Sequence, residues 1–246
     1  MFCCRACKNN VGHGPLCEKR LRDSVTNAVL PTAYCINLDR EPQKFEKIQK
    51  EFKGVLNVMK VSAIDGELHK IPGRIALRQT NKILFRKFAS SNYKLPYAIV
   101  LEDDIYKLPQ FHAYWPKIAE FINKGEKWDF ISLDFHCRML EPVINPHNSF
   151  LYRIGKNLAT GFMIYNTKFI RKNLRYLLSM NKNVDVYIKW IPRFRQLIPN
   201  QLLVKQNVNK LSKTANRNTR DYEQWYNVTR HFLRIHSNSK DADHSK

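Results

Sequence analysis

Residues 96–101, with the sequence Pro-Tyr-Ala-Ile-Val-Leu, form the segment that most constrains how this chain can fold. The segment is nearly all apolar, so a strand formed by it has to be covered by other residues on both faces. Strands of this kind occur in α/β proteins, where helices pack on the two sides of a mostly parallel sheet. The segment therefore predicts an α/β fold with this strand inside the sheet.

The chain before this segment predicts the same architecture. Residues 34–38 form a short apolar run that is typical of a buried strand. Residues 42–52 follow with apolar side chains at helical spacing and a proline at the start, which is a favourable first-turn residue. Residues 55–63 are mostly apolar and β-branched, so they predict a second strand. A β-α-β order of this kind predicts parallel strands joined by a right-handed crossover.

The later segments continue the alternation. Helices are predicted near residues 73–88, 112–124 and 169–178, and strands near residues 128–133 and 160–165. A length of 246 residues suits a single domain. We assign this domain to residues 30–235, with a Cys-rich extension at residues 1–29 and a polar tail at residues 236–246 that is expected to be disordered.

The charge of the chain is strongly unbalanced. There are 42 Lys and Arg residues against 21 Asp and Glu residues, which gives 42 − 21 = +21. A hydrophobic content of 43% is enough for a packed core and excludes a wholly disordered chain. The excess of cations indicates an anionic partner, which is a nucleic acid, an acidic membrane surface or a phosphorylated ligand such as a nucleotide sugar.

Cysteines gather near the N-terminus. No signal peptide or membrane-spanning segment is visible in the sequence, so we expect a cytoplasmic protein, in which clustered cysteines favour metal binding over disulfides. Cys4, Cys7, His13 and Cys17 resemble the ligands of a zinc knuckle, a nucleic-acid-binding module, with the histidine one residue later than in that family. The alternatives are a Zn²⁺ site here or a disordered cysteine-bearing extension. A nucleic-acid-binding protein is therefore the second functional hypothesis.

Three acids, Glu102, Asp103 and Asp104, follow the central strand directly. Open α/β sheets bind ligands in the crevice beyond the carboxyl ends of their strands, where these acids would lie. Adjacent carboxylates repel one another, so a divalent cation would stabilise them. Alternation along an extended chain places Glu102 and Asp104 on one side as metal ligands and points Asp103 away. The alternative is that the acids cap a following helix or pair with surface lysines.

Basic side chains on two other segments have two interpretations each. The cations of residues 73–88, Lys82 among them, either meet a phosphate or form a solvated helix face. Residues 220–234 combine aromatic and basic side chains, which either stack on nucleic-acid bases or pack as an amphipathic helix.

Four segments in order resemble glycosyltransferase family 25, which includes bacterial lipooligosaccharide glycosyltransferases and collagen galactosyltransferases. They are residues 34–40 (Tyr-Cys-Ile-Asn-Leu-Asp-Arg), 63–66 (Ala-Ile-Asp-Gly), 98–104 (Ala-Ile-Val-Leu-Glu-Asp-Asp) and 160–164 (Thr-Gly-Phe-Met-Ile). The resemblance covers residues 32–206 and implies a GT-A-type single domain with a mainly parallel twisted sheet. It also implies a divalent metal, Mn²⁺ by preference, and a UDP-hexose donor. The implied acceptor is a hydroxyl of a glycan or of a protein, with collagen-like chains included.

The resemblance also implies roles for individual residues, with inverting sugar transfer as the reaction. Glu102 and Asp104 match the metal motif, with Asp104 as the more direct ligand. Asp185 is the candidate base that takes the acceptor proton, and Asp134, which ends the predicted strand at residues 128–133, competes for this role. The candidate nucleotide-binding residues are Asn37, Leu38, Arg40, Asp65, Gly66, Lys82, Asp103, Thr160 and Gly161.

Overall fold

The computed structural model describes residues 30–124, 126–135, 145–146, 150–153, 159–189, 194–207, 227 and 229. The predicted N-terminal extension with its zinc-knuckle residues, the C-terminal tail, and nearly all of residues 208–235 lie outside the described residues. The elements described below all belong to the compact unit Thr32–Lys246. Within the part of the chain that the structure describes, no helix has the length and apolar character needed to cross a membrane.

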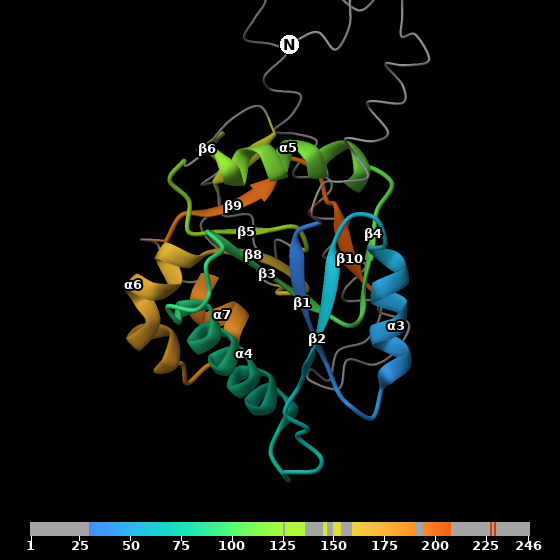
Figure 1. Ribbon diagram of the computed structural model, residues 1–246, viewed down its shortest axis with the longest axis vertical. Helices are drawn as coiled ribbons and strands as arrows, with labels where there is room; N and C mark the ends of the chain where they lie inside the picture. The colour runs from blue at the N-terminus through green and yellow to red at the C-terminus, as the bar shows by residue number, and fades with distance from the viewer. Residues whose placement is uncertain are drawn as a thin grey trace, which may run out of the picture. The chain divides into compact units, whose positions relative to one another are not determined.

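Strands and helices alternate along most of the unit (Figure 1). The helices are α3 (Pro42–Glu51), α4 (Gly73–Ala89), α5 (Phe111–Asn123), α6 (Thr167–Leu178) and α7 (Val184–Lys189). The strands are β1 (Thr32–Asn37), β2 (Asn57–Ser62), β3 (Tyr97–Glu102), β4 (Ile105–Lys107), β5 (Phe130–Ser132), β6 (Asn145–Pro146), β7 (Leu151–Arg153), β8 (Phe162–Asn166), β9 (Gln196–Pro199) and β10 (Val204–Gln206). The helices and strands that the sequence predicts all form, with their ends shifted by a few residues.

An eight-stranded sheet has the order β2-β1-β3-β8-β5-β9-β7-β6. The parallel pairs are β1 with β2, β1 with β3, and β5 with β9. β8 lies antiparallel between β3 and β5, and β7 is antiparallel to β9 and β6. All strands except β8 and β7 therefore run in one direction, which confirms an α/β fold with a mostly parallel sheet. A separate pair is formed by β4 and β10, which are antiparallel.

Helices cover both faces of the sheet, as the apolar strand at residues 96–101 predicts. Successive residues of a strand point to opposite faces, so each inner strand supplies two cores. In β3, Ile99 and Leu101 join a core beneath α3 and α5, whereas Ala98 and Val100 join a core beneath α4, α6 and α7. Figure 1 shows α3 and α4 on opposite sides of the sheet.

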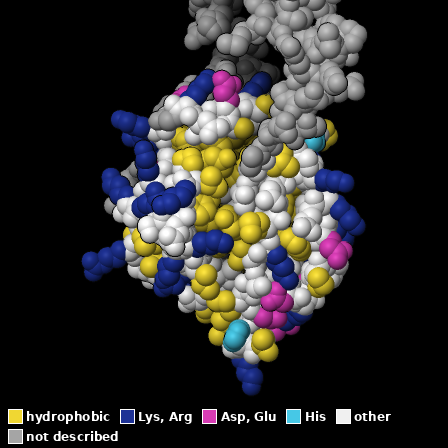
Figure 2. All heavy atoms as spheres, in the orientation of Figure 1, with side chains coloured by type: hydrophobic (Ala, Val, Ile, Leu, Met, Phe, Trp, Pro, Cys, Tyr) yellow, Lys and Arg dark blue, Asp and Glu magenta, His cyan; other side chains and the backbone are white. Residues whose placement is uncertain are grey.

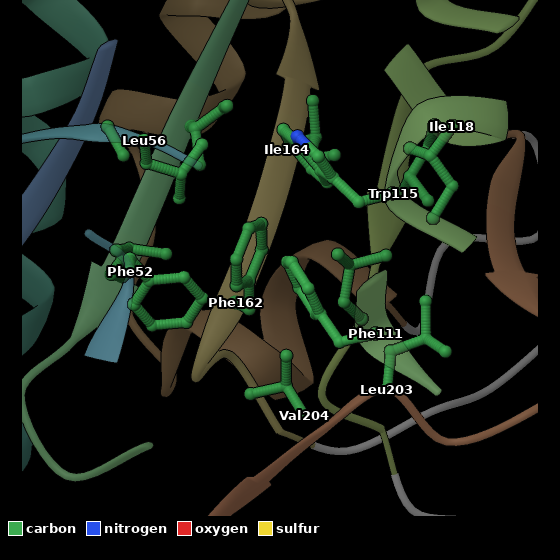
Figure 3. Packing of buried hydrophobic residues seen from close by; sticks show 14 of the residues in the cluster. Phe52, Leu56, Phe111, Trp115, Ile118, Phe162, Ile164, Leu203 and Val204 are labelled. Atoms are coloured by element: carbon green, nitrogen blue, oxygen red, sulfur yellow. The ribbon is translucent and has the colours of Figure 1, made fainter. Parts of the chain in front are cut away.

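The core beneath α3 and α5 is centred on aromatic rings (Figure 3). The ring of Phe162, on β8, is fully buried and lies 5.7 Å from that of Phe52, 6.2 Å from that of Phe111 and 6.1 Å from that of Trp115, between ring centroids. Aromatic pairs of this kind contribute about 0.5–1.5 kcal/mol each beyond their buried area. Phe162 therefore joins the middle of the sheet to both helices on this side.

Replacement of this ring tests that role. We expect Phe162→Leu to lower the free energy of unfolding by about 1–1.5 kcal/mol, because ring contacts are lost while an apolar side chain remains. Chemical denaturation measures the change. Met163→Leu, at a buried neighbour on the opposite face, is the control and should cost less because it conserves volume. Equal losses in the two variants would contradict a special role for the aromatic cluster.

Candidate functional site

A pocket of about 790 Å³ opens at the carboxyl ends of β1, β2 and β3. The chain passes from β1 to β2 on one side of β1 and then to β3 on the other side, so the pocket lies where the strand order reverses, a common ligand position in open α/β sheets. Its lining comes from Asn37 and Leu38 after β1, from residues 63–67 after β2, from Glu102, Asp103 and Asp104, and from α3 and the first turn of α4. Most of the sequence-predicted site residues therefore converge on one cavity.

Asn37 holds the middle acid in place. It is almost fully buried at the end of β1, and its Nδ2 donates to Asp103 Oδ2 at 2.7 Å and to the carbonyl of Glu41 at 3.0 Å. Asp103 therefore faces the pocket together with its neighbours, and the prediction that it points away is wrong. The reason is local: Asp103 and Asp104 form a turn between β3 and β4, so the strict alternation of a strand does not apply to them.

Glu102 is positioned by neutral donors. Thr160 Oγ1 donates to its Oε1 at 2.6 Å, and Gln206 Nε2 donates to its Oε2 at 3.0 Å. Its backbone N–H donates to the carbonyl of Gly161 at 2.9 Å. The end of β3 is thus tied to the start of β8 and to β10, which come from distant parts of the sequence.

The loss of one of these donors should be measurable. We expect Thr160→Val to lower the free energy of unfolding by about 1.5 kcal/mol, because it removes a hydrogen bond to a carboxylate while keeping the shape of the side chain. Thermal unfolding measures the effect. Thr160→Ser keeps the hydroxyl and is expected to restore most of the stability. A Val variant as stable as the Ser variant would show that this hydrogen bond does not hold Glu102.

The third acid of the cluster, Asp104, has a buried carboxylate oxygen. Its Oδ1 is shielded from solvent and has no hydrogen-bond partner within the part of the chain that the structure describes, while its backbone carbonyl accepts from the N–H of Asn207 at 2.5 Å. Burial raises the pKa of Asp104 well above its ordinary value, and Glu102, Asp103 and Asp134 raise it further. Lys44 acts in the opposite direction. Burial also raises the pKa of Asp103, whereas the hydrogen bond from Asn37 lowers it.

These features fit a hard divalent cation that takes only some of its ligands from the protein. No group of three or more His, Cys, Asp or Glu side chains within the described ranges is arranged to hold a metal by itself. Cations such as Mg²⁺ and Mn²⁺ are, however, often held by one or two carboxylates, with waters and substrate phosphates as the other ligands. Asn37 and Asp104 both line the pocket, and the Oδ1 atom of each is a buried acceptor oxygen with no donor among the described residues. The residues present therefore fit an ion that is shared with a phosphorylated ligand.

Asp134 lies directly behind this cluster. It is fully buried, and its carboxylate occupies the space that a side chain at position 161 would need. Gly161 is therefore required by the close approach of Asp134 and of Ile105. The side chain of Asp134 has no exposed surface in this structure, and its charge raises the pKa of the neighbouring Asp104.

Arg40 and Asp65 form the opposite wall of the pocket. Arg40 Nη1 lies 2.6 Å from Asp65 Oδ2 and 2.9 Å from Glu67 Oε2, and Asp65 Oδ1 accepts from the N–H of Glu67 at 2.9 Å. Gly66 follows at a tight turn, where an added Cβ would lie 2.6 Å from the carbonyl oxygen of Ile71. The Asp-Gly pair is thus explained by backbone geometry as well as by its place at the pocket.

Thr160, Gly161 and Asp134 meet the acidic cluster without lining the pocket, and the described contacts do not test the predicted roles of Lys82 and Asp185. Lys82 is not among the pocket-lining residues, and its pKa is lowered by burial and then by Arg78 and Arg86. Asp185 is on α7, and its side chain lies outside the described parts of the structure. Their proposed roles remain predictions.

Lys44 is the residue that sequence reasoning missed. It belongs to the first turns of α3, lines the pocket and pairs with Glu41. Its pKa is raised by Glu41, Asp103 and Asp104, although burial opposes this. In the sequence it is one of several lysines on a helix, and only its position just after β1 could have indicated that it lies at the carboxyl edge of the sheet.

Comparison with known proteins finds similarity among solved structures. No protein-family model matches the chain, and no curated protein matches it. Among solved structures, the chain is similar to a glycosyltransferase involved in the glycosylation of the major capsid of PBCV-1. The identity is 13%, the TM-score is 0.42, and the match covers 84% of this chain and 100% of that chain.

Proposed function

We propose that the protein is a metal-dependent, inverting hexosyltransferase of the GT-A type, which moves a sugar from a UDP-hexose to a hydroxyl of a glycan or protein acceptor. The observation that carries the proposal is the position of Asp104. Its buried, unpartnered Oδ1 lies among three further carboxylates at the edge of a pocket of about 790 Å³. A divalent cation would offset the charge of these carboxylates and would at the same time bind the diphosphate of the donor. Three of the four segments that resemble glycosyltransferase family 25, residues 34–40, 63–66 and 98–104, supply lining residues of the same pocket.

The residues of the chain would divide the work as follows. Asp104 would hold Mn²⁺ through Oδ1, and Glu102, which is held by Thr160 and Gln206, would be a second ligand of the same ion. When bound, the ion supplies Lewis-acid stabilisation of the departing diphosphate. Lys44 and Lys47 line the pocket and would add positive charge near the phosphates. Asn37 would keep Asp103 aligned beside them.

The nucleoside would occupy the part of the pocket beyond β1 and β2. Leu38, Arg40, Asp65 and Gly66 line this part, and the pairing of Arg40 with Asp65 fixes the direction of the carboxylate. Asp65 would accept hydrogen bonds from the ribose or the base. Because Asp65 Oδ1 already accepts a hydrogen bond from the backbone N–H of Glu67, the orientation of the Asp65 carboxylate would be fixed.

Asp185 is our proposed general base. It would take the proton of the acceptor hydroxyl while that oxygen attacks the anomeric carbon from the side opposite to the diphosphate. The complete burial of Asp134 argues against the same role for that residue and favours a positioning role behind Asp104. We therefore expect Asp185→Asn to abolish sugar transfer and to leave UDP binding intact.

A panel of UDP-sugars tests the proposed function. Purified protein is incubated with each sugar nucleotide, with and without Mn²⁺, and UDP release and binding are measured. We expect turnover of at least one UDP-hexose that depends on the metal and is lost in Asp104→Ala. No binding or turnover of any sugar nucleotide would overturn the proposal, and salt-sensitive binding of random oligonucleotides in its place would favour the nucleic-acid hypothesis.

A further inference from the structure

Helices α4 and α6 carry charged side chains of only one sign. They pack against the same core, and neither contains an Asp or Glu. We call the surface that carries these side chains the α4–α6 basic face. Its cations are Arg74, Arg78, Lys82, Arg86 and Lys87 on α4 and Lys168, Arg171, Lys172 and Arg175 on α6. Lys and Arg side chains gather on the left of Figure 2, where Figure 1 shows α6 and α4.

Two of these arginines fasten the helices together. Arg78, in the first half of α4, donates to the carbonyl of Asn181, which lies just after α6. Arg171, in the first half of α6, donates to the carbonyl of Tyr93, which lies just after α4, at 2.6 Å. The two helices are therefore antiparallel, and these two side chains are accounted for by the fold.

Four of the other cations are exposed and have no partner of opposite charge among the described residues. Arg86, Lys168, Lys172 and Arg175 are exposed, and none of them forms an ion pair with a carboxylate of the described residues. All four residues of α6 that are exposed are Lys or Arg. A face with this many uncompensated cations repels itself unless an anionic partner is present.

Large apolar side chains lie exposed among these cations. Ile83 projects from α4 with 52% of its surface exposed, and Leu95, at 41%, lies beside the start of α6, since its carbonyl accepts from Thr167 Oγ1. Met59, at 46%, pairs in the sheet with Tyr34, whose ring lies beneath Lys87 Nζ at 4.4 Å. Three of the four large hydrophobic residues exposed in the described parts of the chain are therefore on or next to this face.

We propose that the α4–α6 basic face docks the protein on an anionic membrane surface. Anionic headgroups would neutralise the cations, and Ile83, Leu95 and Met59 would enter the interface between headgroups and acyl chains. A nucleic-acid phosphate backbone satisfies the cations equally well but offers no partner for exposed aliphatic side chains, and nucleic-acid surfaces use aromatic rings for stacking. The inference does not depend on the proposed enzymatic function.

Sedimentation with lipid vesicles tests the docking surface. The full chain is mixed with vesicles of phosphatidylcholine alone or of phosphatidylcholine with phosphatidylserine, at physiological salt. We expect binding only to the vesicles with phosphatidylserine. Arg86→Gln, Lys172→Gln and Arg175→Gln combined should weaken this binding by about tenfold or more, since each cation near an anionic surface adds to the affinity.

A matched variant removes the same charge elsewhere. Lys50, Lys53 and Lys117 are exposed on or next to α3 and α5, on the opposite side of the sheet, and their combined change to Gln should alter vesicle binding much less. Equal losses in the two triple variants, or equal binding to both kinds of vesicle, would overturn the proposal. Both triple variants should bind UDP alike, so a failure of the enzymatic proposal is seen separately.

Substitution of the exposed apolar side chains distinguishes docking on a membrane from binding to a nucleic acid. Ile83→Gln combined with Leu95→Gln keeps every cation and should weaken vesicle binding severalfold, while thermal unfolding reports on the fold of the variant. Unchanged vesicle binding in this variant would contradict insertion into a membrane. Stronger binding of the wild-type chain to random oligonucleotides than to anionic vesicles would assign the face to nucleic acid instead.

Discussion

Asp104→Asn is expected to lose UDP-hexose turnover by at least about 10²-fold, because it removes from the metal site a carboxylate oxygen that accepts no hydrogen bond from the described residues. The change keeps the size of the side chain, so the pocket should keep its shape. Turnover is measured as UDP release at saturating Mn²⁺. Asp39→Asn is the matched control, because Asp39 is an exposed acid after β1 that pairs with Lys60 and does not line the pocket. Its turnover should be that of the wild type.

The same substitution should make the metal-free protein more stable. The pKa of Asp104 is raised in the folded chain above its ordinary value of 3.8, so the folded state holds this proton more tightly than the unfolded state does. Stability from this group is therefore present below pH 3.8 and is lost as the pH rises through the raised pKa of the folded state. Asp104→Asn removes this loss and should raise the free energy of unfolding at pH 7 by about 1 kcal/mol.

Thermal unfolding with and without Mn²⁺ separates the two effects. The wild type should gain stability when Mn²⁺ is added, because only the folded state collects the ligand. The Asn variant should start from a midpoint that is higher by about 2–4 °C and should gain less from the metal. A variant that is less stable than the wild type without metal, and that responds equally to Mn²⁺, would show that Asp104 is not the ligand.

Gly161→Ala is expected to damage both stability and activity. An added Cβ would lie 2.7 Å from Ile105 Cγ2 and would overlap the carboxylate of Asp134, and neither group can move without disturbing the acids in front of it. Overpacking of this kind costs about 1–3 kcal/mol. Because the Gly161 carbonyl accepts from the N–H of Glu102, a small shift also moves the end of β3. A displacement of about 1 Å at such a site can lower turnover 10²-fold.

Gly54→Ala is the matched control for this substitution. Gly54 has φ +76° and would meet nothing within 4 Å, so a methyl group there strains the backbone without touching the site. We expect a loss of about 1 kcal/mol in the free energy of unfolding with turnover per folded molecule unchanged. If Gly161→Ala lowers stability but leaves turnover intact, the contact between Asp134 and Gly161 has no bearing on the reaction.

Hydrophobic patterning predicted the inner strands correctly because strands that are buried on both faces consist of consecutive apolar residues. β1, β3 and β8 are apolar on both faces, and each corresponds to a run that is visible in the sequence. The helices between them show apolar residues at helical spacing. These signals are local, so they need no knowledge of what packs against them.

The short strands could not be predicted in the same way. β4 and β10 have three residues each and are defined by their pairing with one another across about a hundred residues of sequence. The antiparallel direction of β8 between β3 and β5 likewise depends on its pairing with these two strands and not on its own composition. Strand pairing is a property of the assembled sheet, and a run of apolar residues carries no sign of its direction.

The sequence by itself determined that three acids follow a buried strand. It also determined that Asn37, Asp65 and Gly161 belong to motifs at the ends of other predicted strands. Only the tertiary structure decided how these groups act. It turned Asp103 toward the pocket, buried Asp134 behind Gly161, brought Lys44 to the acids and gave Asp104 Oδ1 no donor among the residues that the structure describes. The reason is that residue type fixes the chemistry of a group, whereas burial, distance and the sign of nearby charges arise only when distant segments meet.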